Sequence, residues 1–282
     1  MINKEACPVC ETNKARYLFT IDIGQLITCQ NCSLIYYIPR PSPEELTKFY
    51  SNENYRKEFS ESLMSGKKFA KQRYFQFEEN IKKYDPKLLN LSSKKILDIG
   101  CGTGDFLNIA QEKNWTIAGQ ELSSEAAISA NQMLGHNCVQ SGDLSILNLP
   151  AEFYDVVTIY HVIEHLISPI EMLQKIHKLV RPGGLVFVET PNIGGLGAKI
   201  QKEKWSQIMP PEHINYFQPA SLKYCFNKAG FLSPKILTRS PIIIESLENM
   251  SFAKQKTASA IYTLAPLFNL GATLQGIARK PT

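Results

Sequence analysis

The chain has 282 residues, of which 44% are hydrophobic and 20% are charged, with a formal net charge of +5 at pH 7. This composition is ordinary for a globular protein and excludes a largely disordered or collagen-like chain. The positive excess is small and, apart from Lys67–Arg73, is not gathered into long basic runs, so charge alone does not predict a nucleic-acid partner. The length allows one large α/β domain with a small appendage.

The amino terminus, MINKEACPVC, lacks the apolar stretch of a signal peptide, so we expect a cytoplasmic protein. In that compartment, seven cysteines indicate a metal site or free thiols rather than disulfides. Near the other end, Thr257–Ala278 holds 22 residues without a charge, but Pro266, Asn269 and two glycines interrupt it. We expect a buried helix followed by a final strand and no membrane span; a membrane-surface contact is the alternative.

Two cysteine pairs, Cys7 with Cys10 and Cys29 with Cys32, are separated from each other by 18 residues, a spacing typical of four-cysteine zinc sites. The segment between them, YLFTIDIGQLIT, predicts a hairpin, so the whole resembles a zinc ribbon. Four thiolates leave no open coordination position, so the expected Zn²⁺ is structural. A ribbon can dock on the main domain, bind a protein partner or read nucleic acid, and the mostly uncharged loop residues favour the main domain or a protein partner over nucleic acid.

The next segment, PRPSPEEL, is a proline-rich link, after which a helix is expected to begin at Ser42 or Pro43. A second helix should follow and end before Pro86. Apolar residues at near-helical spacing predict its core-facing stripe: Phe69, Tyr74, Phe77, Ile81 and Tyr84. We therefore expect a zinc ribbon over residues 1–40, a helical linker or cap over 41–90 and the large domain over 91–282.

A strand, a glycine turn and a helix are predicted in KILDIG, CGTG and DFLNIAQEKN. Gly100, Gly102 and Gly104 allow positive φ and close approach of a ligand, and the following helix presents the positive end of its dipole. The G-x-G-x-G spacing differs from the G-x-G-x-x-G of dinucleotide sites. Because Asp98 and Asp105 flank the turn, a pyrophosphate would be repelled and a cation such as S-adenosylmethionine would be favoured.

Two further acidic residues follow predicted strands. Glu121 ends WTIAGQEL, 21 residues past Gly100, where a carboxylate can accept from both hydroxyls of a ribose; the alternative is a solvated residue opening the next helix. Asp143 follows a short strand in VQSGDL and suits an adenine amino group; the alternative is an ordinary loop aspartate.

The motifs LDIGCGTG, GQELS, SGDL, YDVVTIYHVIEHL, LVRPGGLVFVETPN and PPEHINYF occur in the order seen in class I S-adenosylmethionine-dependent methyltransferases. The chain resembles that family, and looks most like the branch that carries an amino-terminal zinc ribbon and acts mainly on small molecules and glycan or lipid precursors. The resemblance implies a Rossmann-like, doubly wound α/β fold with a mostly parallel sheet and an antiparallel last strand. It makes residues 91–282 the methyltransferase domain.

The resemblance also implies where S-adenosylmethionine binds. The methionine portion would be surrounded by Asp98, Gly100, Gly102 and Asp105, the ribose by Glu121, and the adenine by Asp143 with Leu144. Cys101 would be a small apolar filler of the turn and not a nucleophile. The complete expected cofactor-binding set is Asp98, Gly100, Cys101, Gly102, Gly104, Asp105, Glu121, Leu122, Asp143, Leu144 and Tyr160.

Later elements are expected in the same pattern. A strand is predicted over Tyr154–Tyr160, a helix ending at Arg181–Gly184 and a strand over Leu185–Glu189. Two final strands are predicted near Pro234–Thr238 and Ala272–Ala278, with a long helical insertion between them.

The stretch HVIEHL matches the H-x-x-E-H signature of some zinc proteases, but that motif requires a helix that presents both histidines. Here His161 ends an apolar strand and Glu164 and His165 follow it, so a peptidase is not expected. Small-RNA 3′-end methyltransferases of this fold use a similar Glu-His pair and a later histidine to hold a divalent ion. His213 could be that later ligand, although His161 stands where those enzymes place a carboxylate.

The segment KWSQIMPPEHINYF is expected to form a substrate lid near residues 192–217, stiffened by its two prolines. Trp205, Glu212 and Tyr216 are the predicted substrate contacts. His213 is the first candidate for the base that accepts a proton from a hydroxyl acceptor, and His165 is the second. The alternative for His213 is a hydrogen-bonding role that caps the lid.

Together these features predict an enzyme that methylates a small-molecule acceptor such as a sugar, a glycan or lipid precursor or a polyketide, with a hydroxyl as the expected position. The alternatives are an RNA or protein methyltransferase that docks through the ribbon, and a binding protein that keeps the fold without catalysis. The sequence does not select the acceptor or the oligomeric state.

Overall fold

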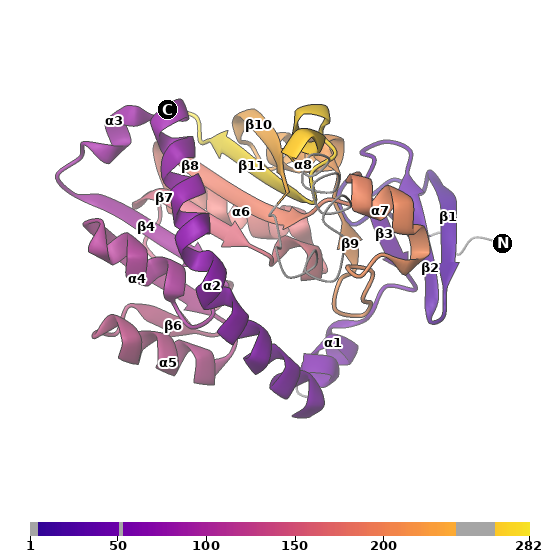
Figure 1. Ribbon diagram of the computed structural model, residues 1–282, viewed down its shortest axis with the longest axis horizontal. Helices are drawn as coiled ribbons and strands as arrows, with labels where there is room; N and C mark the ends of the chain where they lie inside the picture. The colour runs from indigo at the N-terminus through magenta and orange to yellow at the C-terminus, as the bar shows by residue number, and fades with distance from the viewer. Residues whose placement is uncertain (1–4, 51–52, 241–262) are drawn as a thin grey trace, which may run out of the picture. The chain divides into compact units, whose positions relative to one another are not determined.

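The computed structural model describes residues 5–50, 53–240 and 263–282 (Figure 1). The chain forms two compact units, each assembled from segments that are distant in the sequence. Unit 1 comprises residues 1–42, 163–173 and 188–278, and unit 2 comprises residues 43–162, 174–187 and 279–282.

Unit 1 contains a four-stranded sheet in the order β1-β2-β3-β9. All its neighbouring strands are antiparallel: β1 (Ala15–Ile21), β2 (Gly24–Cys29), β3 (Ile35–Ile38) and β9 (Asn215–Tyr216). The predicted hairpin between the cysteine pairs is β1 and β2, so that prediction is confirmed. β9 comes from a segment almost 180 residues further along the chain and adds itself to the edge of β3.

The second sheet has seven strands in the order β10-β11-β8-β7-β4-β5-β6. β4 is parallel to both β5 and β7, and β5 is parallel to β6. The last strand, β11, lies between β8 and β10, which confirms the Rossmann-like α/β fold. The strand bounds are β4 (Lys94–Ile99), β5 (Trp115–Glu121), β6 (Val139–Ser141), β7 (Tyr154–Tyr160), β8 (Val180–Pro191), β10 (Leu232–Arg239) and β11 (Thr273–Arg279).

The helices expected to begin at Ser42 or Pro43, to end before Pro86 and to follow the glycine turn are confirmed as α1, α2 and α4. Their bounds are α1 (Pro43–Tyr50), α2 (Glu53–Tyr84), α3 (Pro86–Leu89), α4 (Asp105–Glu112), α5 (Ser124–Leu134), α6 (Pro169–Leu179), α7 (Leu196–Gln201) and α8 (Pro219–Lys228). Short 3₁₀ turns are η1 (Ile163–His165), η2 (Lys202–Lys204) and η4 (Ala265–Phe268).

The predicted stripe of α2 forms part of the core of unit 2, where α2 packs along α4 (Figure 1). Tyr74, Phe77 and Ile81 are all buried. The Phe77 ring lies 5.4 Å from that of Phe106 and 5.7 Å from that of Trp115, measured between centroids. The Trp115 indole donates to the Tyr74 hydroxyl at 3.1 Å, so this buried N–H has its partner.

One element boundary was predicted wrongly. The helix expected to end at Arg181–Gly184 ends at Leu179, and those four residues belong to β8. Backbone hydrogen bonds explain the difference, because Gly183 N donates to Lys280 O at 3.2 Å and Lys280 N donates to Gly184 O at 2.9 Å. Pairing with the end of the chain thus outweighs the turn tendency of the Pro-Gly-Gly sequence.

The two final strands, predicted near Pro234–Thr238 and Ala272–Ala278, are confirmed as β10 and β11. The helical insertion expected between them falls largely on residues 241–262, outside the described residues. Among the residues that the structure does describe, no helix has the length and apolar character needed to cross a bilayer.

Candidate functional site

The glycine turn follows β4 in unit 2. Gly100, Gly102 and Gly104 have φ of +68°, +55° and +82°, all in the left-handed region that residues other than glycine rarely adopt. A Cβ on Gly100 would lie 2.4 Å from Cγ2 of Val162, so the turn has no room for a side chain there. Gly104 is the N-cap of α4, so the backbone leads directly into the positive end of a helix.

Two buried carboxylates meet this turn from the ends of adjacent parallel strands. Asp98 in β4 is 4% exposed and accepts from Thr158 Oγ1 at 2.6 Å, and burial raises the pKa of its carboxyl to about 7. Glu121 at the end of β5 is 6% exposed and accepts from the N–H groups of Gly102 and Ser123, each at 2.9 Å. Two buried acidic groups at one turn favour a ligand with positive charge.

The remaining predicted cofactor residues occupy the same end of the sheet in unit 2. Asp105 accepts from Thr103 Oγ1 at 2.6 Å, and Asp143 is an exposed residue that accepts from Ser145 N at 2.7 Å; its hydrogen bonds with Ser145 lower the pKa of its carboxyl. Leu144 is buried, whereas Leu122 is 67% exposed.

Two cofactor predictions concern the interior of the turn and the end of β7. Cys101 is buried, and burial raises the pKa of its thiol well above its usual value, which suits a neutral filler. The Tyr160 ring lies 5.2 Å from that of Phe106, and the Arg73 guanidinium carbon lies 4.8 Å from its centroid. The contact of Arg73 with this ring was not predicted from the sequence. The only signal for Arg73 was its position at the end of the basic run Lys67–Arg73. A glycine-rich turn, two carboxylates and an aromatic ring fit S-adenosylmethionine.

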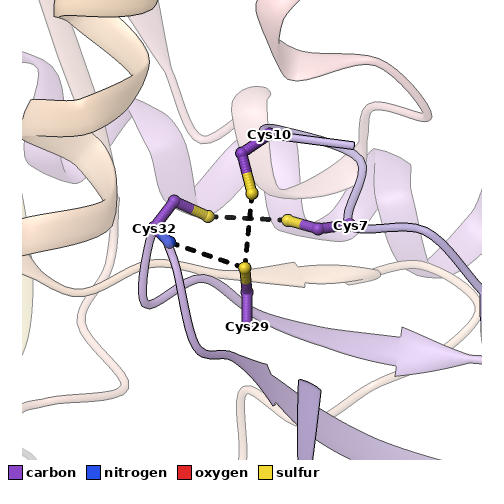
Figure 2. A group of neighbouring side chains, drawn as sticks. All are labelled: Cys7, Cys10, Cys29 and Cys32. Atoms are coloured by element: carbon purple, nitrogen blue, oxygen red, sulfur yellow. Dashed lines mark hydrogen bonds between the residues drawn. The ribbon is translucent and has the colours of Figure 1, made fainter. Parts of the chain in front are cut away.

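In unit 1 the four ribbon cysteines point toward one another (Figure 2). Their sulfurs lie 3.5 Å apart for Cys7 with Cys32 and 3.3 Å apart for Cys10 with Cys29. All four lie within 4.8 Å of one another, close to the edge of about 3.8 Å that four Zn–S bonds of about 2.3 Å give in a tetrahedron. The contact with Cys32 lowers the pKa of the Cys7 thiol to about 5, and burial raises that of Cys29. The four residues fit a structural Zn²⁺.

Unit 1 also brings together Glu164, His165 and His213, which we call the histidine cluster. Their ligand atoms lie within 4.8 Å of one another, and the two imidazole centroids are 4.8 Å apart. Glu164 is buried and its Oε2 accepts from Thr190 Oγ1 at 2.9 Å. The two histidines were predicted together from the sequence.

Hydrogen bonds fix the tautomer of both rings. His165 Nδ1 lies 2.9 Å from Glu212 O, and His213 Nδ1 lies 2.9 Å from Gln207 O. Because a carbonyl only accepts, each ring carries a proton on Nδ1. Burial lowers the pKa of His165, so that ring is neutral at pH 7. Such a cluster can accept a proton or hold a divalent metal ion.

The geometry does not match a zinc-protease helix. Glu164 and His165 lie on η1, a single 3₁₀ turn, and β7 ends at Tyr160. His161 follows with φ of +54°. Among the described residues, the set that could hold a metal at this site does not include His161.

The predicted substrate contacts belong to unit 1, and their side chains are largely buried. Trp205 is 9% exposed, and Tyr216 is 3% exposed and donates its hydroxyl to His213 O at 2.7 Å. Glu212 is half-buried and meets His165 through its backbone carbonyl. Sequence reasoning missed Arg40 and Asn215, which bind the loops that carry the histidines. Asn215 stands within the motif PPEHINYF, which was the available signal, whereas Arg40 shows no periodicity or motif that could have found it.

A family model described as a methyltransferase domain matches residues 69–232, which is more than half of the chain. The chain belongs to this methyltransferase family. It is therefore an S-adenosylmethionine-dependent methyltransferase, as its glycine turn and carboxylates indicate.

Two relatives agree with this assignment. The chain is 30% identical over 165 residues to a ubiquinone biosynthesis O-methyltransferase of Nitrosomonas europaea, covering 54% of this chain and 70% of the relative. It is 28% identical to the protein of the same name in Thiobacillus denitrificans, covering 54% and 71%.

Two solved structures share the fold. A SAM-dependent methyltransferase of Archaeoglobus fulgidus matches with a TM-score of 0.52 at 22% identity, covering 73% of this chain and 94% of that one. A phosphoethanolamine N-methyltransferase 2 of Haemonchus contortus matches with a TM-score of 0.55 at 16% identity, covering 88% and 62%. At these identities the likeness shows the fold alone.

Proposed function

We propose that this methyltransferase methylates a hydroxyl oxygen of a small molecule, such as a sugar, a glycan or lipid precursor, a polyketide or a related ring compound. The observation that carries the proposal is the pair of histidines that lie beside a buried carboxylate, each with its Nδ1 hydrogen-bonded to a backbone carbonyl. A proton acceptor is useful when the acceptor is a hydroxyl, because that oxygen must lose its proton. The two relatives named above are O-methyltransferases, which supports the same position.

On the cofactor side, S-adenosylmethionine supplies an electrophilic methyl carbon. Gly100, Gly102, Asp98 and Asp105 would hold its methionine portion, because the backbone allows close approach and the carboxylates attract the ammonium and sulfonium charges. Glu121 would accept from the ribose hydroxyls. Asp143 with Leu144 would contact the adenine.

On the acceptor side, His213 Nε2 would take the hydroxyl proton as the oxygen bonds to the methyl carbon. The bond between that carbon and the sulfonium sulfur would break at the same time, and its electron pair would stay on sulfur in the departing thioether. His165 is the second candidate for this step, since burial keeps its ring neutral. The hydrogen bonds to Gln207 O and Glu212 O fix the tautomer in advance, so no proton has to move before the reaction. Trp205, Glu212 and Tyr216 would shape the acceptor side.

A divalent metal ion is the second candidate for the histidine cluster. The observation that favours it is that both rings donate Nδ1–H to carbonyls and the carboxylate accepts from Thr190, which is the usual outer hydrogen bonding of metal ligands. Titration of Mn²⁺ followed by its electron paramagnetic resonance signal distinguishes the two. Mn²⁺ binding by the wild type that is lost in Glu164→Gln supports a metal site. A free-ion signal that stays unchanged when the protein is added supports the role of proton acceptor.

We also propose that Cys7, Cys10, Cys29 and Cys32 hold a structural Zn²⁺. The reduced thiols that such a site requires agree with the cytoplasmic location expected from the sequence. The edge of β3 that a partner strand could use is paired with β9, which argues for a role of the ribbon inside this chain and against addition of a protein partner's strand at that edge.

Transfer of a radioactive methyl group from S-adenosylmethionine to a panel of hydroxylated sugars, quinols and polyketides tests the proposal. With an acceptor found, His213→Ala should lower kcat by about 100-fold or more while calorimetry shows unchanged cofactor affinity. His136→Ala, at an exposed position, is the matched control and should match the wild type. Full turnover by the His213 variant would leave that histidine only a hydrogen-bonding role.

A further inference from the structure

The ribbon is joined to the histidine cluster by a short backbone pairing within unit 1. β3 pairs with β9 in the register Ile35 with Tyr216 and Tyr36 with Asn215. Tyr37 N also donates to Ile214 O at 3.1 Å. Since β9 begins two residues after His213, the edge of the ribbon fixes the backbone on which that histidine stands.

Arg40 extends this connection to the second histidine. Its guanidinium donates to Ile214 O at 2.8 Å and to Asn215 Oδ1 at 3.0 Å. The same side chain donates to Ile167 O at 3.0 Å and to Leu166 O at 3.4 Å. One cation therefore bridges the segment that follows His213 and the segment that follows His165.

Asn215 completes the same bridge from the β9 side. It is 1% exposed, and its Nδ2 donates to Leu166 O at 2.6 Å. The neighbouring Ile214 N donates to Glu164 O at 3.0 Å. All three members of the histidine cluster are thus held by hydrogen bonds to backbone groups within two residues of their own positions.

The two cysteine pairs are anchored to the helix that follows β9. Lys228 Nζ donates to Val9 O at 2.8 Å, between Cys7 and Cys10. Gln218 Nε2 donates to Ser33 O at 2.7 Å, next to Cys32. Gln218 is the N-cap of α8 and Lys228 is its last residue, so the metal-binding turns are fastened at both ends of this helix.

We infer that the four-cysteine ribbon is a positioning module for the histidine cluster and that Arg40 is the positioning residue through which it acts. A metal bound by the four cysteines would hold the two cysteine turns together and so fix β3 next to β2. β3 and Arg40 in turn fix the positions of the loops that carry His165 and His213. The ribbon serves this chain's own acceptor site. Its catalytic consequence rests on the proposed function, whereas the positioning itself does not.

Histidine ring spectroscopy tests the positioning without an acceptor. The chain has five histidines, few enough for each ring to be assigned in ¹H–¹⁵N spectra. In the wild type, His165 and His213 should both show a proton fixed on Nδ1. Arg40→Ala should abolish or broaden these two signatures and leave His136 unchanged. Arg16→Ala, an exposed arginine in β1 of the same ribbon, should keep all signals.

Two more variants make the result decisive. Arg40→Lys keeps the charge but cannot reach both segments at once, so it should restore the signatures only in part. Cys32→Ser, which should lose the metal, should disturb the same two histidines. Cofactor affinity measured by calorimetry should stay within about twofold in each variant, since the cofactor residues belong to unit 2.

The inference is overturned if Arg40→Ala or Cys32→Ser leaves both Nδ1–H signatures unchanged in a folded chain. If Arg40→Ala does not fold, Arg40→Lys decides alone by the same criterion. With an acceptor in hand, a displaced cluster should lower kcat by up to about 100-fold at an unchanged KM for the cofactor. Changed signatures without any hydroxyl methylation would retain the positioning role and reject the proposed reaction.

Discussion

The buried carboxyl of Asp98 should make stability depend on pH in an unusual direction. Its pKa is about 7 in the folded chain against an ordinary value of 3.8, because burial penalises the charged form more than Thr158 and Arg73 favour it. The folded state therefore holds this proton more tightly than the unfolded state. The free energy of unfolding should fall as pH rises from about 4 to about 7 and level off above, with a total of about 4 kcal/mol from this group.

Asp98→Asn isolates this contribution, because the amide is almost the same size, can accept from Thr158 and does not titrate. Urea unfolding without cofactor, at intervals from pH 4 to pH 8, gives the difference in unfolding free energy between variant and wild type. That difference should grow in favour of the variant by about 4 kcal/mol across the range. Glu112→Gln, at an exposed position, should give a flat difference. A flat or falling curve for the Asp98 variant would refute a buried carboxyl with a raised pKa.

Three structural predictions concern the zinc site, the glycine turn and the packing of β5. Elemental analysis should find one zinc per chain in the wild type and in Cys138→Ser and none in Cys32→Ser; zinc retained in the last would reject the four-thiolate site. Gly100→Ala should cost about 1–3 kcal/mol in denaturant unfolding, and adding Val162→Ala should recover part of it by removing the contacting methyl groups; no recovery would place the whole cost in the positive φ. Gly119→Ala should cost about 1–3 kcal/mol by overpacking, since its Cβ would meet three side chains within 3 Å; a neutral change would contradict that packing.

Much of the fold could be predicted because its signals are local. β4, the glycine turn and α4 follow from an apolar run, three glycines and an amphipathic pattern in consecutive residues. The spacing of the four cysteines is a local signal of the same kind, and by itself it indicates a shared metal. Glu121 could be anticipated at the glycine turn because parallel strands end at the same edge of a sheet.

What could not be predicted depends on partners that are distant in the sequence. The inclusion of Gly183 and Gly184 in β8 depends on pairing with Lys280, which no local pattern shows. The addition of β9 to the ribbon is set by only two residues, too few for a period-2 signal. Arg40 could not be recognised for the same reason, because a side chain that binds backbone carbonyls more than 120 residues away leaves no motif of its own.

Calorimetric titration with S-adenosylmethionine tests the central claim that the glycine turn and its carboxylates bind the methyl donor. The wild type should bind one equivalent per chain. Glu121→Gln should weaken binding by about 10- to 100-fold, because a charged hydrogen-bond acceptor is lost, and Glu112→Gln should have no effect. No binding by the wild type, or wild-type affinity in the Glu121 variant, would contradict the account.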